Sequence, residues 1–130
     1  MANKVWVYVE HFKDTIAPAS LEALGEARRL AAALGGGVTA LIFGAGMKDL
    51  AQTAIAHGAD EVLLGDDATL KEFRAEAHAA LLVKLATTAE HKPEVILAGA
   101  TTRGRDLLGM ASVDFNSGSI ADAVQLAAVD

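Results

Sequence analysis

The sequence lacks cysteine entirely, and it contains only two prolines and few aromatic residues in a chain of 130 residues. The absence of cysteine excludes disulfides, thiolate zinc sites and cysteine catalysis, and it is typical of a reducing compartment. A formal net charge of −6 argues against a nucleic-acid-binding surface. No apolar run is long enough to span a membrane, and the N-terminus leads into a strand without a signal or transit peptide. We therefore expect a cytoplasmic protein with no membrane insertion.

Short apolar runs alternate with segments of helical periodicity along the chain. Hydrophobic residues make up 52% of the sequence, which indicates one globular domain, residues 1–130, that is large enough to bury a sizeable core. The apolar runs predict buried strands at residues 5–10, 38–43, 61–64 and 95–98, with a weaker signal for a fifth strand near residues 120–126.

The segments between these strands carry helix signals. Pro18 suits the first turn of a helix that the glycines at 35–37 end, and a short helix is expected at 48–57. Thr69 and Glu72 have the spacing of a capping box, which predicts a long helix from residue 69 to about residue 90. Alternating strands and helices predict an α/β three-layer sandwich with a mostly parallel sheet, Rossmann-like or flavodoxin-like. We expect the Rossmann-like form, similar to the adenine-nucleotide alpha-hydrolase-like folds.

The turn after the strand at 95–98 is the strongest candidate for a binding site. A glycine-flanked turn followed by a helix places free backbone N–H groups at the carboxyl edge of the sheet, where the helix dipole favours an anion. Two arginines add positive charge there. The candidate residues, for a nucleotide or for a subunit interface, are Gly99, Thr101, Thr102, Arg103, Gly104 and Arg105.

This turn departs from a phosphate-binding loop of the Walker A type. Gly99 and Gly104 have the right separation, but Arg105 and Asp106 stand where that loop needs Lys and Ser or Thr. An aspartate repels phosphate and cannot replace the hydroxyl. The alternative is that Arg103 and Arg105 form surface ion pairs, with Asp106 or with a neighbouring subunit.

Other motifs give no catalytic residues and no metal site. The turn at residues 44–46 begins like a dinucleotide fingerprint but lacks its third glycine, so a plain turn is expected. Asp66 and Asp67 precede a helix, where we expect them to cap it. His11 follows the first strand at the ligand edge, and we expect a solvated loop histidine there. With scattered histidines and no nucleophile elbow, the residues indicate a binding or scaffold domain rather than an enzyme.

Several segments, in this order, carry a resemblance to a known family: residues 5–10, 21–24 with 27–31, 57–62, 95–107, and Ala121-Asp122 followed by Leu126. Over nearly the whole chain they resemble the N-terminal domain of the electron transfer flavoprotein alpha subunit. The match at residues 95–107 is the most specific one. The resemblance therefore includes the candidate binding turn.

The resemblance implies a scaffold function without catalysis. In that family an alpha subunit pairs with a beta subunit, and the heterodimer carries electrons on FAD from acyl-CoA or similar dehydrogenases to a quinone oxidoreductase. It also implies that a C-terminal domain of the alpha subunit holds the FAD, a domain absent from this chain, which stops at Asp130. The beta subunit would hold AMP or a second FAD. The alternative is an independent module that binds AMP or ATP and resembles a universal stress protein.

Overall fold

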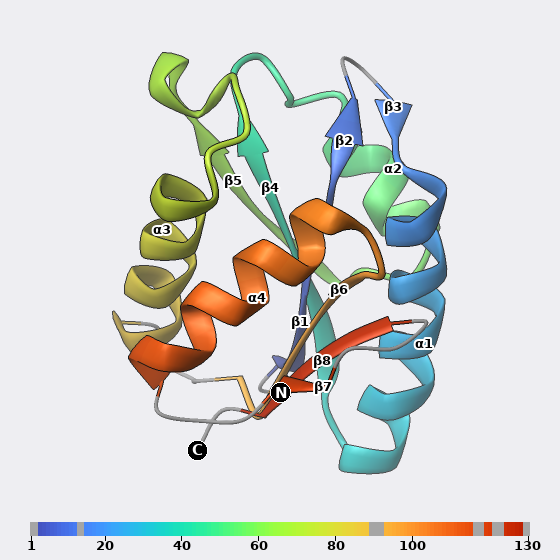
Figure 1. The fold of residues 1–130 in the computed structure, drawn as a ribbon. Coiled ribbons are helices and arrows are strands. Elements are labelled where there is room, and N and C mark those ends of the chain that lie inside the picture. The colour runs from blue at the N-terminus through green and yellow to red at the C-terminus, as the bar shows by residue number, and fades with distance from the viewer. Residues whose placement is uncertain (1–2, 13–14, 89–92, 116–118, 121–123, 129–130) are drawn as a thin grey trace.

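A six-stranded sheet forms the middle layer of the domain, with helices on both of its faces (Figure 1). The computed structural model describes residues 3–12, 15–88, 93–115, 119–120 and 124–128. The strands of the sheet are β1 (Asn3–Tyr8), β4 (Gly37–Gly44), β5 (Glu61–Asp66), β6 (Val95–Gly99), β7 (Ser119–Ile120) and β8 (Val124–Ala128). The helices are α1 (Pro18–Leu34), α2 (Leu50–Ala56), α3 (Ala75–Thr88) and α4 (Thr102–Phe115), with a 3-10 turn, η1 (Ala68–Leu70), before α3.

The strand order in space is β5-β4-β1-β6-β8-β7. The first four of these strands are parallel, whereas β8 runs antiparallel to β6 and β7 antiparallel to β8. The chain builds outward from β1 to β4 and β5 on one side, and then crosses to β6 on the other. This arrangement confirms the predicted Rossmann-like three-layer sandwich. In such sheets the point where the strand order reverses, here between β1 and β6, is the usual place for a ligand.

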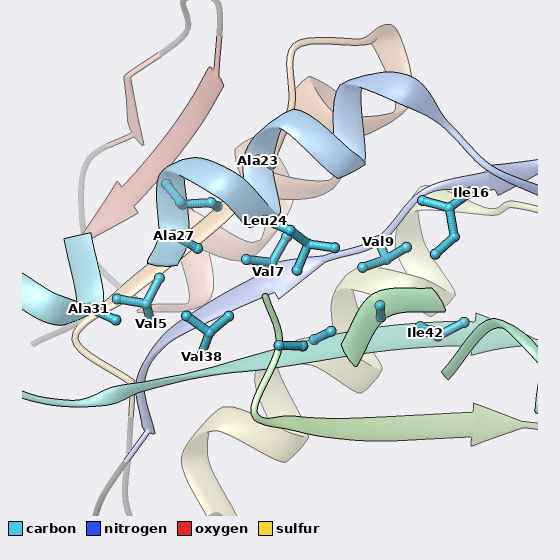
Figure 2. Packing of buried hydrophobic residues seen from close by; sticks show 14 of the residues in the cluster. Val5, Val7, Val9, Ile16, Ala23, Leu24, Ala27, Ala31, Val38 and Ile42 are labelled. Atoms are coloured by element: carbon cyan, nitrogen blue, oxygen red, sulfur yellow. The ribbon is translucent and has the colours of Figure 1, made fainter. Parts of the chain in front are cut away.

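The side chains of β1 alternate between two hydrophobic cores, one under each layer of helices. Val5, Val7 and Val9 pack with α1 and α2, as Figure 2 shows for the α1 side. Trp6 and Tyr8 pack with α3 and α4 on the opposite face. Because successive residues of a strand point to opposite faces, the central strand anchors both layers. On the first side, small helix residues let α1 lie close to the sheet, namely Ala23, Ala27 and Ala31.

The boundaries of α1 confirm the signals that predicted it. Pro18 is the first helical residue, where its missing N–H leaves no helical hydrogen bond unmade. Gly35 ends the helix with a positive φ of 75°, a conformation that glycine adopts without strain. Its N–H bonds to the carbonyls of Ala31 and Ala32. No helix within the described residues has the length and apolar character needed to cross a bilayer.

The helix predicted from residue 69 begins instead at Ala75, so the predicted capping box is wrong. Asp67 is the capping residue, because its carboxylate accepts the backbone N–H of Thr69 at 2.9 Å and starts only the single turn η1. The chain then leaves the helical path, and Phe73 packs its ring 5.1 Å from the ring of His78. The predicted end near residue 90 lies outside the described residues.

Two other segments differ from the predicted order of elements. The loop expected after β1 contains a small antiparallel hairpin, β2 (His11–Phe12) paired with β3 (Thr15–Ile16). The fifth strand expected near residues 120–126 is present as the two short strands β7 and β8, and residues 121–123 lie outside the described residues. Both β7 and β8 extend the sheet beyond β6.

Candidate functional site: a cavity at the carboxyl edge of the sheet

A cavity of about 320 Å³ lies at the carboxyl ends of β1 and β4. Its floor comes from Tyr8 and Phe43, which point toward the α3 and α4 layer. Its walls come from the segments that follow these strands, from the stretch between η1 and α3, and from the first turn of α4. The polar and charged side chains in the lining are Tyr8, Glu10, His11, Lys71, Glu72, His78 and Arg103.

Tyr8 and His78 form a buried polar pair in the floor of this cavity. The Tyr8 hydroxyl lies 2.8 Å from Nδ1 of His78, and each residue is only 3% exposed. Burial raises the pKa of the Tyr8 hydroxyl well above its usual value, and the Glu10 carboxylate raises it further while Arg103 opposes this. The hydroxyl therefore keeps its proton.

Burial also lowers the pKa of the His78 imidazole, so this ring is held in the neutral form. The electrostatic effects of the nearby His11 and Arg103 side chains lower the pKa of His78 further, whereas hydrogen bonds with the backbone of Leu70 and Glu72 oppose the shift. The Tyr8 hydroxyl and Nδ1 of the neutral ring share one hydrogen bond, and the tautomer of the ring sets which of the two atoms donates. Nε2 of His78 is buried and has no side-chain hydrogen-bond partner among the described residues.

His11 is a half-buried part of the cavity wall rather than the solvated loop histidine that was expected. Its Nε2 lies 2.7 Å from the carbonyl oxygen of Phe43. Gly44 makes room for this ring, since a Cβ there would come within 3.1 Å of it. A carbonyl only accepts, so Nε2 donates and Nδ1 of the neutral ring is an acceptor. Nδ1 is also buried without a partner in the described part of the chain.

The predicted binding turn is tightly closed by its own hydrogen bonds. The Thr101 hydroxyl donates to Oε1 of Glu10 at 2.5 Å and accepts the Gly104 N–H at 3.0 Å. The N–H groups of Thr101 and Arg105 bond to the carbonyls of Gly99 and Thr101. Two N–H groups at this helix start, those of Thr101 and Gly104, are thus engaged within the chain, and the Arg105 N–H makes the first hydrogen bond of the helix. The Glu10 carboxylate also places a negative charge beside this helix N-terminus.

The two arginines of this turn have different surroundings. Arg103 lines the cavity, with its guanidinium carbon 5.3 Å from the centre of the Phe73 ring. Arg105 and Thr102 are exposed. Neither arginine forms an ion pair with Asp106 in the described residues, where Arg29 pairs with Glu26 instead, so the predicted pairing with Asp106 is wrong. A role of this turn in nucleotide binding stays a prediction.

Of the predicted capping residues, Asp67 caps η1, whereas Asp66 accepts the Gly46 N–H at 2.9 Å. The expected capping role is therefore confirmed for Asp67, although it caps a single 3-10 turn, and it is wrong for Asp66, whose carboxylate binds the turn after β4 instead. In the described residues no three side chains of His, Cys, Asp or Glu gather in a group that could hold a metal ion.

Sequence reasoning did not single out His78, although a signal for it was present. His78 shares a helical face with Ala79, Leu82 and Ala86, all buried. A histidine on the apolar face of a helix is expected to point inward. Its pairing with Tyr8 depends on the fold, because 70 residues separate the two in the sequence.

Comparison with known proteins finds one matching family model and several similar proteins. The family model described as "Electron transfer flavoprotein domain" matches residues 5–130. The chain is 40% identical to Protein FixB of Clostridium saccharobutylicum, with 94% of the chain and 36% of that protein covered. It is 38% identical to the electron transfer flavoprotein subunit alpha of Megasphaera elsdenii, with 97% of the chain and 37% of that protein covered. The chain thus spans about a third of the length of these curated relatives.

Proposed function

The chain belongs to the electron transfer flavoprotein family, and from this membership we propose that it is the N-terminal scaffold domain of an alpha subunit. In this proposal the domain assembles with a beta subunit and supports electron transfer on FAD from acyl-CoA or similar dehydrogenases. The observation that carries it is the family match over residues 5–130 together with the short share of each relative that the chain covers. The domain works in the cytoplasm and is a carrier component rather than an enzyme.

FAD would be held mainly by sequence that this chain does not include, and AMP by the partner. The surroundings of the α4 N-terminus support this division of labour. A flavin dinucleotide needs N–H donors for its diphosphate, whereas those of Thr101, Gly104 and Arg105 are already bonded. The Glu10 carboxylate bonded to Thr101 opposes an anion at the same place. These contacts support a site for FAD outside this turn, and we assign no redox step to its residues.

We place the contact with the beta subunit along β5 and α2. β5 is an edge strand of the sheet, and an uncovered edge offers backbone groups to a partner. Ile55 of α2 and Leu64 of β5 are large apolar residues that are 46% and 36% exposed. The two elements pack against each other, and in this proposal both exposed side chains belong to the contact.

Cofactor analysis of the purified chain tests whether it holds FAD, AMP or ATP by itself. The chain is denatured and any released small molecule is identified by mass spectrometry. The proposal expects an empty chain. FAD at about one per chain would overturn the scaffold role, and AMP or ATP at that ratio would instead favour the independent nucleotide-binding module.

Assembly is tested by mixing the chain with the beta subunit of the same organism in analytical ultracentrifugation. We expect a heterodimer, and we expect Leu64→Lys to weaken it by about tenfold or more, since a buried charge at an interface costs more than 1.4 kcal/mol. Met110→Lys is the matched control, because Met110 is also exposed, at 43%, but lies on α4. Absence of any complex would contradict the proposed function, whereas equal effects of the two variants would contradict only the placement of the contact.

A further inference from the structure

Residues 71–74, here called the wall segment, join η1 to α3 and border the cavity. Their side chains are exposed except for that of Phe73, which is half-buried. The Lys71 N–H bonds back to η1, and the Arg74 carbonyl accepts the N–H of His78 in α3. Both hydrogen bonds join near neighbours in the sequence, so they do not fasten the wall segment to the sheet.

The His78 ring connects the wall segment to the interior of the domain. The Phe73 ring packs edge to face on it, with 5.1 Å between the ring centres. The backbone of Leu70 and Glu72 also hydrogen-bonds the His78 ring. On the inner side, the same ring bonds the Tyr8 hydroxyl of β1 at 2.8 Å. One imidazole therefore holds the segment to the central strand of the sheet.

A proton on His78 would put an unpaired positive charge in this place. His78 is only 3% exposed, and no carboxylate forms an ion pair with it in the part of the chain that the structure describes. The Glu10 carboxylate binds the Thr101 hydroxyl instead, and the Arg103 guanidinium carries a like charge. An unpaired charge is costly to bury. The ionisable side chains that line the cavity with His78 are Tyr8 of β1, Glu10 beyond it, His11 of β2, Lys71 and Glu72 of the wall segment and Arg103 of α4, whereas β4 contributes the uncharged Phe43.

Hydration of the His78 ring removes this cost. Burial lowers the pKa of His78 in the closed arrangement, and His11 and Arg103 lower it further. When water reaches the ring, its pKa returns toward the ordinary histidine value of about 6.5. The hydrated arrangement therefore binds more protons than the closed one, so a falling pH favours it.

The wall segment is the neighbour of His78 that can move at least cost. Its displacement breaks the packing of Phe73 and the backbone contacts with the His78 ring. Movement of β1 or β4 would instead disrupt the middle of the six-stranded sheet, and α4 is fixed by Leu107 and Leu108, which are completely buried. Local openings occur where few apolar contacts are buried and the backbone is exposed.

We propose that the wall segment is a pH-sensitive lid of the cavity, closed on the neutral His78 ring and released when that ring takes up a proton. On release, Phe73 leaves its place against His78 and Arg103, and water enters the floor of the cavity. The movement is local, and the sheet stays intact. It concerns this domain alone, so it does not depend on the proposed assembly with a beta subunit.

Hydrogen exchange of backbone amides, followed by NMR on the purified chain, tests this lid. The reporters are the N–H groups of Lys71 and His78, whose hydrogen bonds begin or end in the wall segment. Their protection, corrected for intrinsic exchange, is compared at about pH 7.5 and about pH 5.5, and we expect it to fall about three- to tenfold, the upper limit set by a histidine pKa of about 6.5. It should also be lower than the protection of α1 and insensitive to urea below the unfolding transition, as local opening requires.

Two pairs of variants separate the proton from the packing. His78→Gln should abolish the dependence of protection on pH, and the exposed His57→Gln should keep it. Phe73→Ala should lower the protection of the His78 amide about tenfold or more at neutral pH, because it removes the aromatic contact. The matched control is Lys71→Ala, an exposed position in the same segment, which should stay within about twofold.

The proposal is overturned if the Lys71 and His78 amides have the protection and the urea dependence of α1, because they then exchange only when the whole domain unfolds. It is equally overturned if their protection is the same at both pH values, or if His78→Gln keeps the decrease. The parent protein alone decides the first two outcomes, so the test does not depend on whether His78→Gln folds.

Discussion

The Tyr8 hydroxyl lies 2.8 Å from Nδ1 of His78 in the interior of the domain, and this hydrogen bond joins the central strand β1 to helix α3. Both residues pack edge to face with Phe43, at ring distances of 5.7 Å. The pair therefore combines a polar bond with aromatic packing in one core. Its two partners respond to opposite ends of the pH scale.

Alkaline titration should show a delayed ionisation of Tyr8. It is the only tyrosine in the chain, so phenolate absorbance near 295 nm reports on it alone. A free tyrosine has a pKa of about 10, whereas burial raises the pKa of Tyr8 well above that value. Above pH 10 the unfolded chain loses this proton and the folded chain keeps it, so the free energy of unfolding falls as pH rises. We expect little phenolate signal until the protein unfolds, and a normal titration in concentrated urea. A folded protein with half of its tyrosine ionised near pH 10 would contradict this.

Acidification should destabilise the fold through His78. Burial lowers the pKa of His78, so the folded chain leaves it neutral where the unfolded chain, with a histidine pKa of about 6.5, takes up a proton. The free energy of unfolding therefore falls as the pH drops below about 6.5, until the pKa of the folded state is reached. Urea unfolding between pH 5 and 8 measures this dependence. His78→Gln should be less stable at pH 8 but show a flatter dependence, whereas the exposed His57→Gln should keep the slope of the parent protein.

The bond between Glu10 and Thr101 should contribute measurably to stability. Thr101→Val removes the hydroxyl that donates to the Glu10 carboxylate and accepts the Gly104 N–H. Losing a capping group together with a charged hydrogen bond should cost about 1–3 kcal/mol in unfolding free energy. Thr102→Val changes the exposed neighbour and should stay within about 0.5 kcal/mol. An equal loss of unfolding free energy in the two variants would show that the hydroxyl contacts of Thr101 do not stabilise the fold.

Two glycines of α4 should respond to alanine with opposite signs. A Cβ on Gly104 would lie 2.2 Å from the carbonyl oxygen of Gly99, so either the helix or the turn must move. We expect Gly104→Ala to destabilise the protein by about 1–3 kcal/mol or more, as overpacking does. A Cβ on Gly109 meets nothing within 4 Å, so Gly109→Ala should stabilise the helix by up to about 1 kcal/mol. Thermal unfolding of the two variants measures both effects. A change in melting temperature of the same sign in both variants would contradict the close contact at Gly104.

Local patterns predicted the parts of this fold that depend on neighbours in the sequence. The boundaries of α1 follow from Pro18 and Gly35, and the alternation of β1 follows from its β-branched and aromatic residues. The start of α3 could not be found in this way, because Asp67 and Thr69 satisfy the same capping rule in a single 3-10 turn. Sequence spacing does not distinguish the two outcomes; the packing of Phe73 against His78 does.

The cavity was only partly predictable for a related reason. The carboxyl edge of the sheet and the position of His11 followed from the order of elements. The surroundings of His11 did not, because its partner is a carbonyl of β4, 32 residues away. Glu10 and Thr101 are separated by 91 residues, and only the crossover that places β6 beside β1 brings them together. The arginines of the turn indicated an anion site. The Glu10 carboxylate that binds the edge of this turn comes from a distant part of the sequence, so the turn alone could not reveal it.

The position of β1 between β4 and β6 also has a consequence for how the chain is made. β1 leaves the ribosome before both of its neighbours, and one of them, β6, follows only after β4, β5 and α3. Until then one side of an apolar strand has no hydrogen-bonded neighbour, and such an edge invites pairing with other chains. Pairing β6 with β1 also closes the long chain segment between them, and this slows folding. A newly made chain is therefore most prone to aggregate before β6 pairs with β1, while β1 is still an edge strand.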